Sequence, residues 1–364
     1  MNLNANISRR DFLKLTGLAA GSLLLPARKT SAAMLLQEWP VGANLGRVLG
    51  DIGTYFELRS EPNFNAPVTK GVWRDDILEV KQVVIANQLD PNRYKQRWYE
   101  TPDGFINAIF VQPVKNMPNQ PISAMPLDNE GRPGMWVEVS VPKVGIEYSG
   151  SWDNASHWIK SRFGSPFLYY SQVYWASDIR MRDGQTQYLL SEKYGAAPDN
   201  YWVDARACRP ISEEEVAPIH PDVGDKKVLI NLDYQTVQCF EGSREVYFSE
   251  TSTGWFKEGK RLTPVGTTPV WRKLMSLHMS AYGDEGYDLP GVAWTTIFHP
   301  EGQAIHTAYW HNDFINPLSN GCINLLPHDA KWIWRWINPQ VGYYPGELTV
   351  SGSAQSTFVQ VIER

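Results

Sequence analysis

The stretch that decides the fold covers residues 305–324 and reads IHTAYWHNDFINPLSNGCIN. Its start predicts a strand over 303–308 that carries His306. A loop with proline and asparagine follows and ends at Cys322, ahead of a predicted helix over 327–337. The stretch therefore places an imidazole on a strand and a thiol on a nearby loop.

The residues around the thiol suit nucleophilic catalysis by cysteine. The thiolate is the attacking species, and a nearby imidazole can lower the thiol pKa from its ordinary value of about 8.5. Gly321 removes a side chain beside Cys322, so backbone N–H groups can approach a negatively charged oxygen. His306 is the first candidate for the base, because the loop can fold back across its strand. His311 is nearer in sequence but lies on the loop, and it remains the alternative.

Together these segments resemble the catalytic signature of the L,D-transpeptidase (YkuD) family. In that family a histidine on a strand is followed by a loop and then by Ser/Thr-His-Gly-Cys-hydrophobic-Asn/Arg. Upstream, STG at 252–254 and TPVGT at 263–267 are similar to the family's STG and TPxG strands, which close the site. The resemblance covers residues 226–364. It implies a mainly β fold, with a YkuD-type β-sandwich catalytic domain and one or more short helices.

The resemblance also assigns a role to each matching position. These are Cys322 as nucleophile, His306 as general base, Thr307 as the backbone carbonyl that orients the base, Asn320, Gly321 and Cys322 as the oxyanion hole, and Ser319 and Asn324 as braces of the loop. Asn320 departs from the pattern, since the family usually has histidine there. An amide can supply hydrogen bonds but no charge. The departure leaves altered activity and an inactive binding homologue open as alternatives.

The reaction that the resemblance implies is an acyl transfer on peptidoglycan. Cys322 attacks the carbonyl of the third, diamino-acid residue of a tetrapeptide stem and expels D-Ala. The side-chain amine of another stem then takes the thioester, which gives a cross-link. Capture by water would make an L,D-peptidase, and a non-catalytic wall-binding homologue is a further alternative. We expect no cofactor and no metal, because the 7 histidines are scattered without HExxH spacing.

The first 33 residues are typical of an export signal. Residues 8–14 (SRRDFLK) resemble the twin-arginine motif, an apolar run covers 15–26, and Ser-Ala-Ala at 31–33 suits cleavage. The apolar run is shorter than the roughly 20 residues that a transmembrane helix needs. We expect residues 1–33 to be removed and the mature chain to act in the cell envelope or extracytoplasmic space, without a membrane span. An anchor that is never cleaved is the alternative.

Two small β modules are predicted before the catalytic domain. Residues 45–115 resemble a bacterial SH3-like domain. The resemblance rests on the order of four short segments, LRS (58–60), DILEV (76–80), WY (98–99) and GFI (104–106). Short strands at close spacing predict a small barrel there. A similar series over 135–211 predicts a second, degenerate SH3-like module. The stretches 116–134 and 211–225 are predicted linkers, and the modules are expected to hold glycan or peptide.

Composition places the chain among globular proteins. Its 43% hydrophobic and 20% charged residues exclude disorder, and a net charge of −5 argues against nucleic acid as a partner. Peptidoglycan stem peptides and glycan are the expected partners, and we expect a monomer. The cysteines Cys208, Cys239 and Cys322 are too few for a disulfide scaffold, although one bridge with one free thiol stays open.

Two hairpins and one helix are predicted within the catalytic domain. The hairpins join 237–240 to 244–248 and 294–298 to 303–308. The helix over 327–337 is expected to bury one apolar stripe. That stripe consists of Trp332, Ile333, Trp336 and Ile337.

Overall fold

Strand pairing in the computed structural model divides the chain into three β-rich parts. The structure describes residues 39–363 except 92, 129, 163–165, 196–198 and 282–285, so the predicted export signal lies outside the described residues. The fold is mainly β, as the sequence predicts. Among the described residues no helix has the length and apolar character to cross a membrane.

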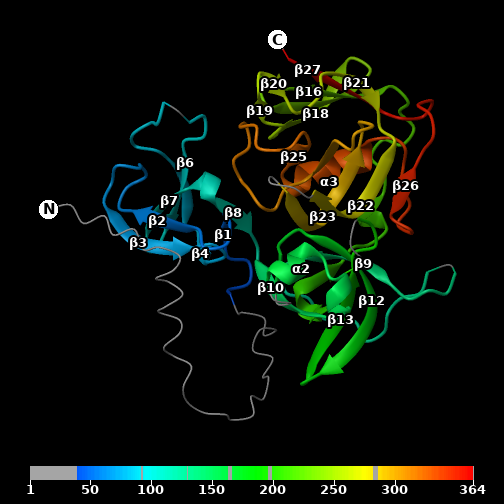
Figure 1. Cartoon of the computed structure of the whole chain (residues 1–364), viewed down its shortest axis with the longest axis horizontal. Helices are drawn as coiled ribbons and strands as arrows, with labels where there is room; N and C mark the ends of the chain where they lie inside the picture. Colours follow the sequence, from blue (N-terminus) through cyan, green and yellow to red (C-terminus); the bar gives the residue numbers. More distant parts are fainter. Residues whose placement is uncertain are drawn as a thin grey trace. The chain divides into compact units, whose positions relative to one another are not determined.

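The first part has two sheets around a small apolar core (Figure 1). Its elements are β1 (Leu45–Val48), β2 (Tyr55–Arg59), β3 (Val68–Trp73), β4 (Ile77–Glu79), β5 (Gln82–Ile85), β6 (Arg97–Thr101), β7 (Gly104–Asn107), η2 (Ala108–Phe110) and β8 (Val111–Val114). The strand orders are β4-β1-β8 and β3-β2-β7-β6-β5. Short strands at close spacing are present as expected, and the likeness to an SH3-like domain stays a prediction.

The second part is one seven-stranded sheet, in the order β11-β10-β14-β13-β12-β9-β15. Its elements are β9 (Met135–Val139), β10 (Lys143–Tyr148), η3 (Trp152–Asn154), α2 (His157–Ser161), β11 (Phe167–Tyr169), β12 (Val173–Arg182), β13 (Gln185–Ser191), β14 (Asn200–Asp204), η4 (Ala205–Ala207) and β15 (Cys208–Pro210). Strands β12 and β14 carry Trp175 and Trp202. The assignment of this part as a degenerate SH3-like module stays a prediction.

The third part is a β-sandwich of two five-stranded sheets, with orders β18-β17-β16-β27-β21 and β25-β24-β23-β22-β26. After η5 (Glu214–Val216), its strands are β16 (Lys226–Asn231), β17 (Thr236–Glu241), β18 (Arg244–Glu250), β19 (Phe256–Lys257), β20 (Lys260–Arg261), β21 (Gly266–Pro269), β22 (Arg272–Ala281), β23 (Tyr287–Ile297), β24 (Ala304–Thr307), β25 (Ile323–Leu325), β26 (Glu347–Thr349) and β27 (Phe358–Ile362). Both predicted hairpins are present, as β17–β18 and β23–β24.

The helix α3 (Pro327–Trp336) packs between the two sheets, and it ends one residue earlier than predicted. The ring of Trp332 stacks on Tyr247 of β18, with centroids 4.0 Å apart. The ring of Trp334 meets Trp294 of β23 at 5.4 Å. The prediction of a single apolar stripe was therefore incomplete. The helix has a sheet on each side, so tryptophans on two of its faces are covered. Trp334 is fully buried, and Trp332 is only partly buried.

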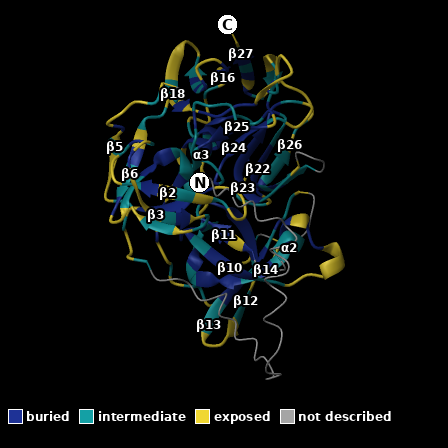
Figure 2. Ribbon diagram, turned by 60° about the vertical axis from the view of Figure 1, so that its left-hand side comes forward, coloured by how far each residue is buried: buried dark blue, intermediate teal, exposed yellow. Residues whose placement is uncertain are grey.

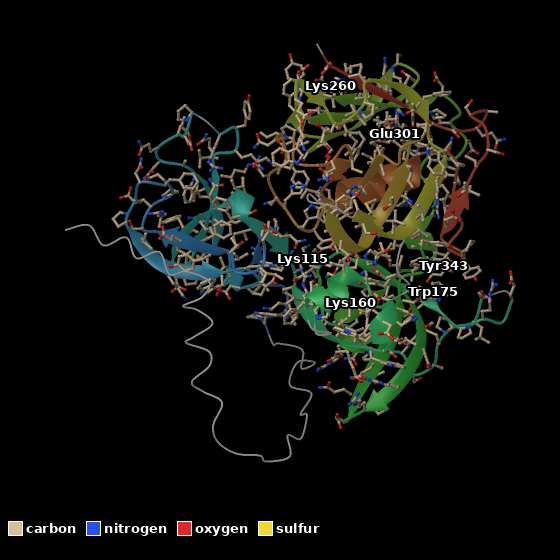
Figure 3. The ribbon with its side chains drawn as sticks, viewed as in Figure 1. Lys115, Lys160, Trp175, Lys260, Glu301 and Tyr343 are labelled. Atoms are coloured by element: carbon tan, nitrogen blue, oxygen red, sulfur yellow. The ribbon has the colours of Figure 1, made fainter. Side chains whose placement is uncertain are left out.

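The second and third parts share one apolar core. Trp136 and Trp175 of the seven-stranded sheet belong to the same buried cluster as β16, β23 and α3. The indole Nε1 of Trp136 donates to the carbonyl of Tyr343, which is labelled in Figure 3, at 2.8 Å, and the ring of Trp175 lies 5.6 Å from that of Tyr344. This cluster extends into β24 and β25, the buried strands that carry the site (Figure 2).

Candidate active site

The imidazole of His306 is buried on β24, between β23 and β25. Its Nδ1 lies 3.1 Å from the carbonyl oxygen of Thr307, which accepts the ring N–H. The other ring nitrogen, Nε2, is then left without a proton. Burial lowers the pKa of His306 to about 4, because a buried imidazolium loses its hydration. His306 is therefore neutral at pH 7 and has a lone pair available to accept a proton.

The thiol of Cys322 lies on the same face of the sheet as His306. Strands β24 and β25 are parallel, and His306 pairs with Asn324. Side chains on a strand alternate between faces, so Cys322, two residues before Asn324, shares the face of Asn324 and His306. Burial raises the pKa of the Cys322 thiol, while a backbone hydrogen bond from Ala304 acts in the opposite direction. The resting thiol is therefore protonated at neutral pH.

His306 and Cys322 line one cavity of about 150 Å³. One wall comes from the β22–β23 hairpin, with Met279, Tyr287 and Leu289. The opposite wall is the loop before Cys322. The cavity therefore has an apolar side and a reactive side, and its titratable groups are an imidazole, a thiol and a phenol.

Ser319 shapes the turn that presents the thiol. Its hydroxyl donates to the carbonyl of Cys322 at 2.6 Å and accepts the N–H of Gly321 at 3.0 Å. Gly321 has φ of 122°, and a Cβ there would lie 2.8 Å from the carbonyl oxygen of Leu262. Only glycine fits without strain. The amide of Gly321 is already engaged by Ser319, so the N–H groups of Asn320 and Cys322 are the better candidates for an oxyanion hole.

The two upstream segments of the signature hold this turn in place. The hydroxyl of Thr263 donates to the carbonyl of Gly321 at 3.0 Å and accepts the N–H of Gly254 at 2.8 Å. Gly254 also pairs with Ser319, and a Cβ on Gly254 would lie 2.9 Å from the Cα of Gly321. The segments that the sequence places far apart therefore meet at the cysteine loop.

Asn324 connects this loop to His311. Its backbone pairs with Ser252, at 2.9 and 3.1 Å, and its side-chain amide lies 2.8 Å from His311 Nε2. Burial lowers the pKa of His311 to about 3, and the nearby His306 makes a smaller contribution in the same direction. His311 does not line the cavity that contains Cys322. The geometry thus favours His306 over His311 as the group that faces the thiol.

Asn320, the departure from the family pattern, lies at the cavity mouth. It is exposed and lines the cavity with Cys322. Its side chain makes no hydrogen bond with the part of the chain that the structure describes, so the amide faces solvent and cavity.

Tyr287 is a cavity residue that sequence reasoning missed. Burial raises the pKa of its phenol, and the charge of a Cys322 thiolate adds to the effect, which places the two side chains near each other. A strand pattern before residue 294 would have been the signal. Pro290 and Gly291 interrupt that pattern.

The other two cysteines lie apart from the cavity. Cys208 and Cys239 are free and fully buried, and burial raises the pKa of both thiols. The one bridge that cysteine counting left open is absent from this structure. Three buried side chains that could hold a metal ion lie elsewhere, at Glu192, Asp199 and His278.

Comparison with known proteins finds one family match, in the third part of the chain. Residues 225–350 match the model of the YkuD family, the L,D-transpeptidase catalytic domain. The third part of this chain is therefore a YkuD catalytic domain. No curated protein matches the chain.

Several solved structures are similar to part of the chain. An L,D-transpeptidase of Enterococcus faecium is 20% identical, with a TM-score of 0.30 over 39% of this chain and 52% of that protein. The L,D-transpeptidase 3 of Mycobacterium tuberculosis is 18% identical, with a TM-score of 0.30 over 51% of this chain and 78% of that protein. The chain thus spans about half the length of the Enterococcus protein.

Proposed function

We propose that this protein is an exported peptidoglycan L,D-transpeptidase that works through a thioester on Cys322. The observation that carries the proposal is the shared cavity, which both the Cys322 thiol and the neutral imidazole of His306 line. A base whose pKa lies near 4 is unprotonated across the neutral range. It can therefore accept the thiol proton as the sulfur attacks.

In the first half-reaction, Cys322 Sγ attacks the carbonyl carbon of the third residue of a tetrapeptide stem. The thiol proton passes to His306 Nε2, and the backbone N–H of Cys322 hydrogen-bonds the oxygen of the tetrahedral intermediate. The bond to D-Ala then breaks, and His306 returns the proton to the leaving amine. The carbonyl of Thr307 holds Nδ1–H throughout, so Nε2 keeps its orientation.

In the second half-reaction, the side-chain amine of another stem attacks the thioester carbonyl. His306 accepts a proton from the amine and returns it to the Cys322 sulfur as that bond breaks. The product is a cross-link between two stems. Water in place of the amine would release a tripeptide stem, which is the L,D-peptidase alternative.

The experiment that tests this function is incubation of the full chain with a disaccharide tetrapeptide, followed by mass spectrometry of the products. We expect a dimer that has lost one D-Ala, and no dimer with Cys322→Ala. A tripeptide monomer alone would assign the peptidase reaction. Unchanged substrate with a correctly folded wild type would leave the non-catalytic homologue as the explanation and overturn the proposal.

The remaining parts of the chain complete the proposal. The export signal over 1–33 would take the protein through the twin-arginine route to the cell envelope. The two β modules over 45–115 and 135–211 would hold glycan or stem peptide near the catalytic domain, and the chain would act as a monomer. No cofactor is required for the thioester chemistry.

A further inference from the structure

A cluster of ionisable side chains lies away from the active-site cavity, where the second part meets the catalytic domain. His278 of β22 contacts the carboxylate of Glu192 through Nδ1 and that of Asp288 through Nε2. Ligand atoms of Glu192, Asp199 and His278 all lie within 4.8 Å of one another, and these three residues are at most 8% exposed. The export, SH3-like and catalytic signatures of the sequence leave this cluster unexplained.

The cluster has an excess of negative groups. Three carboxylates, Glu192, Asp199 and Asp288, face a single imidazole, and no lysine or arginine among the described residues forms an ion pair with them. The carboxylate of Asp199 accepts hydrogen bonds from the hydroxyl and the N–H of Ser156. Burial of unbalanced charge is costly, so such a site favours a bound cation or a shared proton.

Two buried tyrosine hydroxyls near the cluster have only each other as hydrogen-bond partners among the described residues. Tyr174 and Tyr201 are at most 1% exposed, and neither phenolic oxygen makes a hydrogen bond of ordinary geometry with any other described residue. Burial raises the pKa of both phenols, and the charge of the Glu192 carboxylate adds to the effect. The Tyr174 hydroxyl lies 2.5 Å from where a Cβ on Gly291 would be, and the N–H of Gly291 donates to Glu192 at 3.0 Å. Two buried phenols that have only each other as partners keep hydrogen-bonding capacity for a further ligand.

We propose that Glu192, Asp199 and His278 bind one divalent transition-metal cation, with Zn²⁺ as the best match. One imidazole nitrogen with two carboxylate oxygens is a common Zn²⁺ ligand set, whereas Mg²⁺ and Ca²⁺ prefer oxygen alone. Asp288 accepts the Nε2–H of His278 and so acts as the outer carboxylate that orients a metal-bound imidazole. The cation takes the place of the proton on His278 Nδ1, which leaves to solvent.

The proposed metal site lies directly behind one wall of the active-site cavity. His278 and Asp288 face the cluster, while their neighbours Met279, Tyr287 and Leu289 face the active-site cavity. Strands β22 and β23 pair there, with Met279 opposite Leu289. A cation bound to Glu192 and Asp199 would therefore tie the cavity wall to the second part of the chain. It would stabilise the fold and take no part in the thioester chemistry.

The test is isothermal titration of the metal-stripped full chain with ZnCl₂, in a Cys322→Ala background so that the active-site thiol cannot bind Zn²⁺. We expect one Zn²⁺ per chain, a higher melting temperature with Zn²⁺, and weaker responses to MgCl₂ and CaCl₂. Asp199→Asn should weaken Zn²⁺ binding by about tenfold or more, since it replaces a ligand charge with an amide of the same shape. His328→Gln, at an exposed histidine beside Asp329, is the matched control and should bind as the parent does.

Two outcomes would overturn the assignment. One is the absence of Zn²⁺ binding and of any thermal shift, which would mean that a shared proton satisfies the cluster. The other is Zn²⁺ binding that Asp199→Asn leaves unchanged, which would place the metal elsewhere. Circular dichroism is the check that Asp199→Asn folds, and His278→Gln provides a second ligand variant.

Discussion

At the scale of single residues, the nucleophile and the base are both uncharged in the resting site. Burial raises the pKa of Cys322 and lowers that of His306 to about 4. A thiolate–imidazolium pair is therefore not the ground state. The proton has to move as the substrate carbonyl is attacked, which confines reactivity to substrates that fit the cavity.

His306 should matter more for acylation than His311. His306→Ala is expected to slow acylation by a β-lactam about a hundredfold or more, since it removes the general base. His311→Ala should cost less, because His311 contacts Asn324 and does not line the cavity. Stopped-flow acylation at pH 7 measures both variants. A larger loss in His311→Ala would contradict the assignment.

The wild-type rate should also fall as the solution becomes acidic. The lowered pKa of His306 keeps the imidazole neutral until the pH approaches about 4, where protonation removes the lone pair that accepts the thiol proton. The same acylation assay between pH 3 and pH 8 should therefore show the loss near pH 4 rather than near the ordinary value of about 6.5. A midpoint at 6.5 would indicate a solvated base.

Asn320→His tests the departure from the family signature. A histidine at this exposed position beside the cavity would be partly charged at pH 6 and would favour the Cys322 thiolate. Acylation should therefore be faster at pH 6, with a smaller gain at pH 9, where more thiolate is already present. Identical pH profiles for alkylation of Cys322 would mean that position 320 contributes only its backbone.

The signature predicted the partners of the site but not all of their contacts. Ser319 was predicted to brace the loop, and its hydroxyl makes two hydrogen bonds within the turn. One of them occupies the amide of Gly321, which the oxyanion-hole prediction had left free. The hydrogen bond between Asn324 and His311 was likewise not predictable, because it depends on side-chain packing between strand β25 and a loop.

At the scale of elements, the cysteine turn depends on Thr263. Thr263→Val keeps the shape but leaves the N–H of Gly254 and the carbonyl of Gly321 unpaired, at a cost of about 1–3 kcal/mol for each buried group. We expect a lower melting temperature and acylation slowed about tenfold or more, because the thiol loses its fixed position. Thermal unfolding and stopped-flow acylation test this.

The matched control for that variant is Thr267→Val, at an exposed position on β21. It should leave both the melting temperature and the acylation rate unchanged. If the two valine variants have the same melting temperature and acylation rate, the hydrogen bonds of the Thr263 hydroxyl contribute nothing to stability or acylation.

Local patterns predicted the elements that pair with sequence neighbours. The hairpins β17–β18 and β23–β24 and the helix α3 all follow from alternation and turn residues within short windows. The parallel pairs β16–β27 and β24–β25 bring together distant or loop-separated strands. No short window contains that information, so the face shared by His306 and Cys322 emerged only from the structure.

At the scale of the whole molecule, the second and third parts of the chain share one apolar core across the boundary predicted between them. Residues 135–211 and 226–364 were predicted as separate modules, yet Trp136 and Trp175 pack into the catalytic core. Apolar residues that cover a neighbouring domain look like ordinary core residues in the sequence. The catalytic domain is thus supported by the part that precedes it.

Export should depend on the twin arginines. Replacing Arg9 and Arg10 with lysine is expected to hold the precursor in the cytoplasm, because both residues belong to the predicted twin-arginine export motif over 8–14. Fractionation and immunoblotting of the full chain measure this. Arg28→Lys, in the same segment, is the control and should export normally. Normal export of the double-lysine variant would point to another route.

The measurement that tests the central claim most directly is intact-mass spectrometry of the full chain after incubation with a carbapenem. The account predicts one covalent adduct on the wild type and none on Cys322→Ala. Cys208→Ala and Cys239→Ala should keep the adduct, since both thiols are buried away from the cavity. An unchanged adduct on Cys322→Ala would contradict the assignment of Cys322 as the nucleophile.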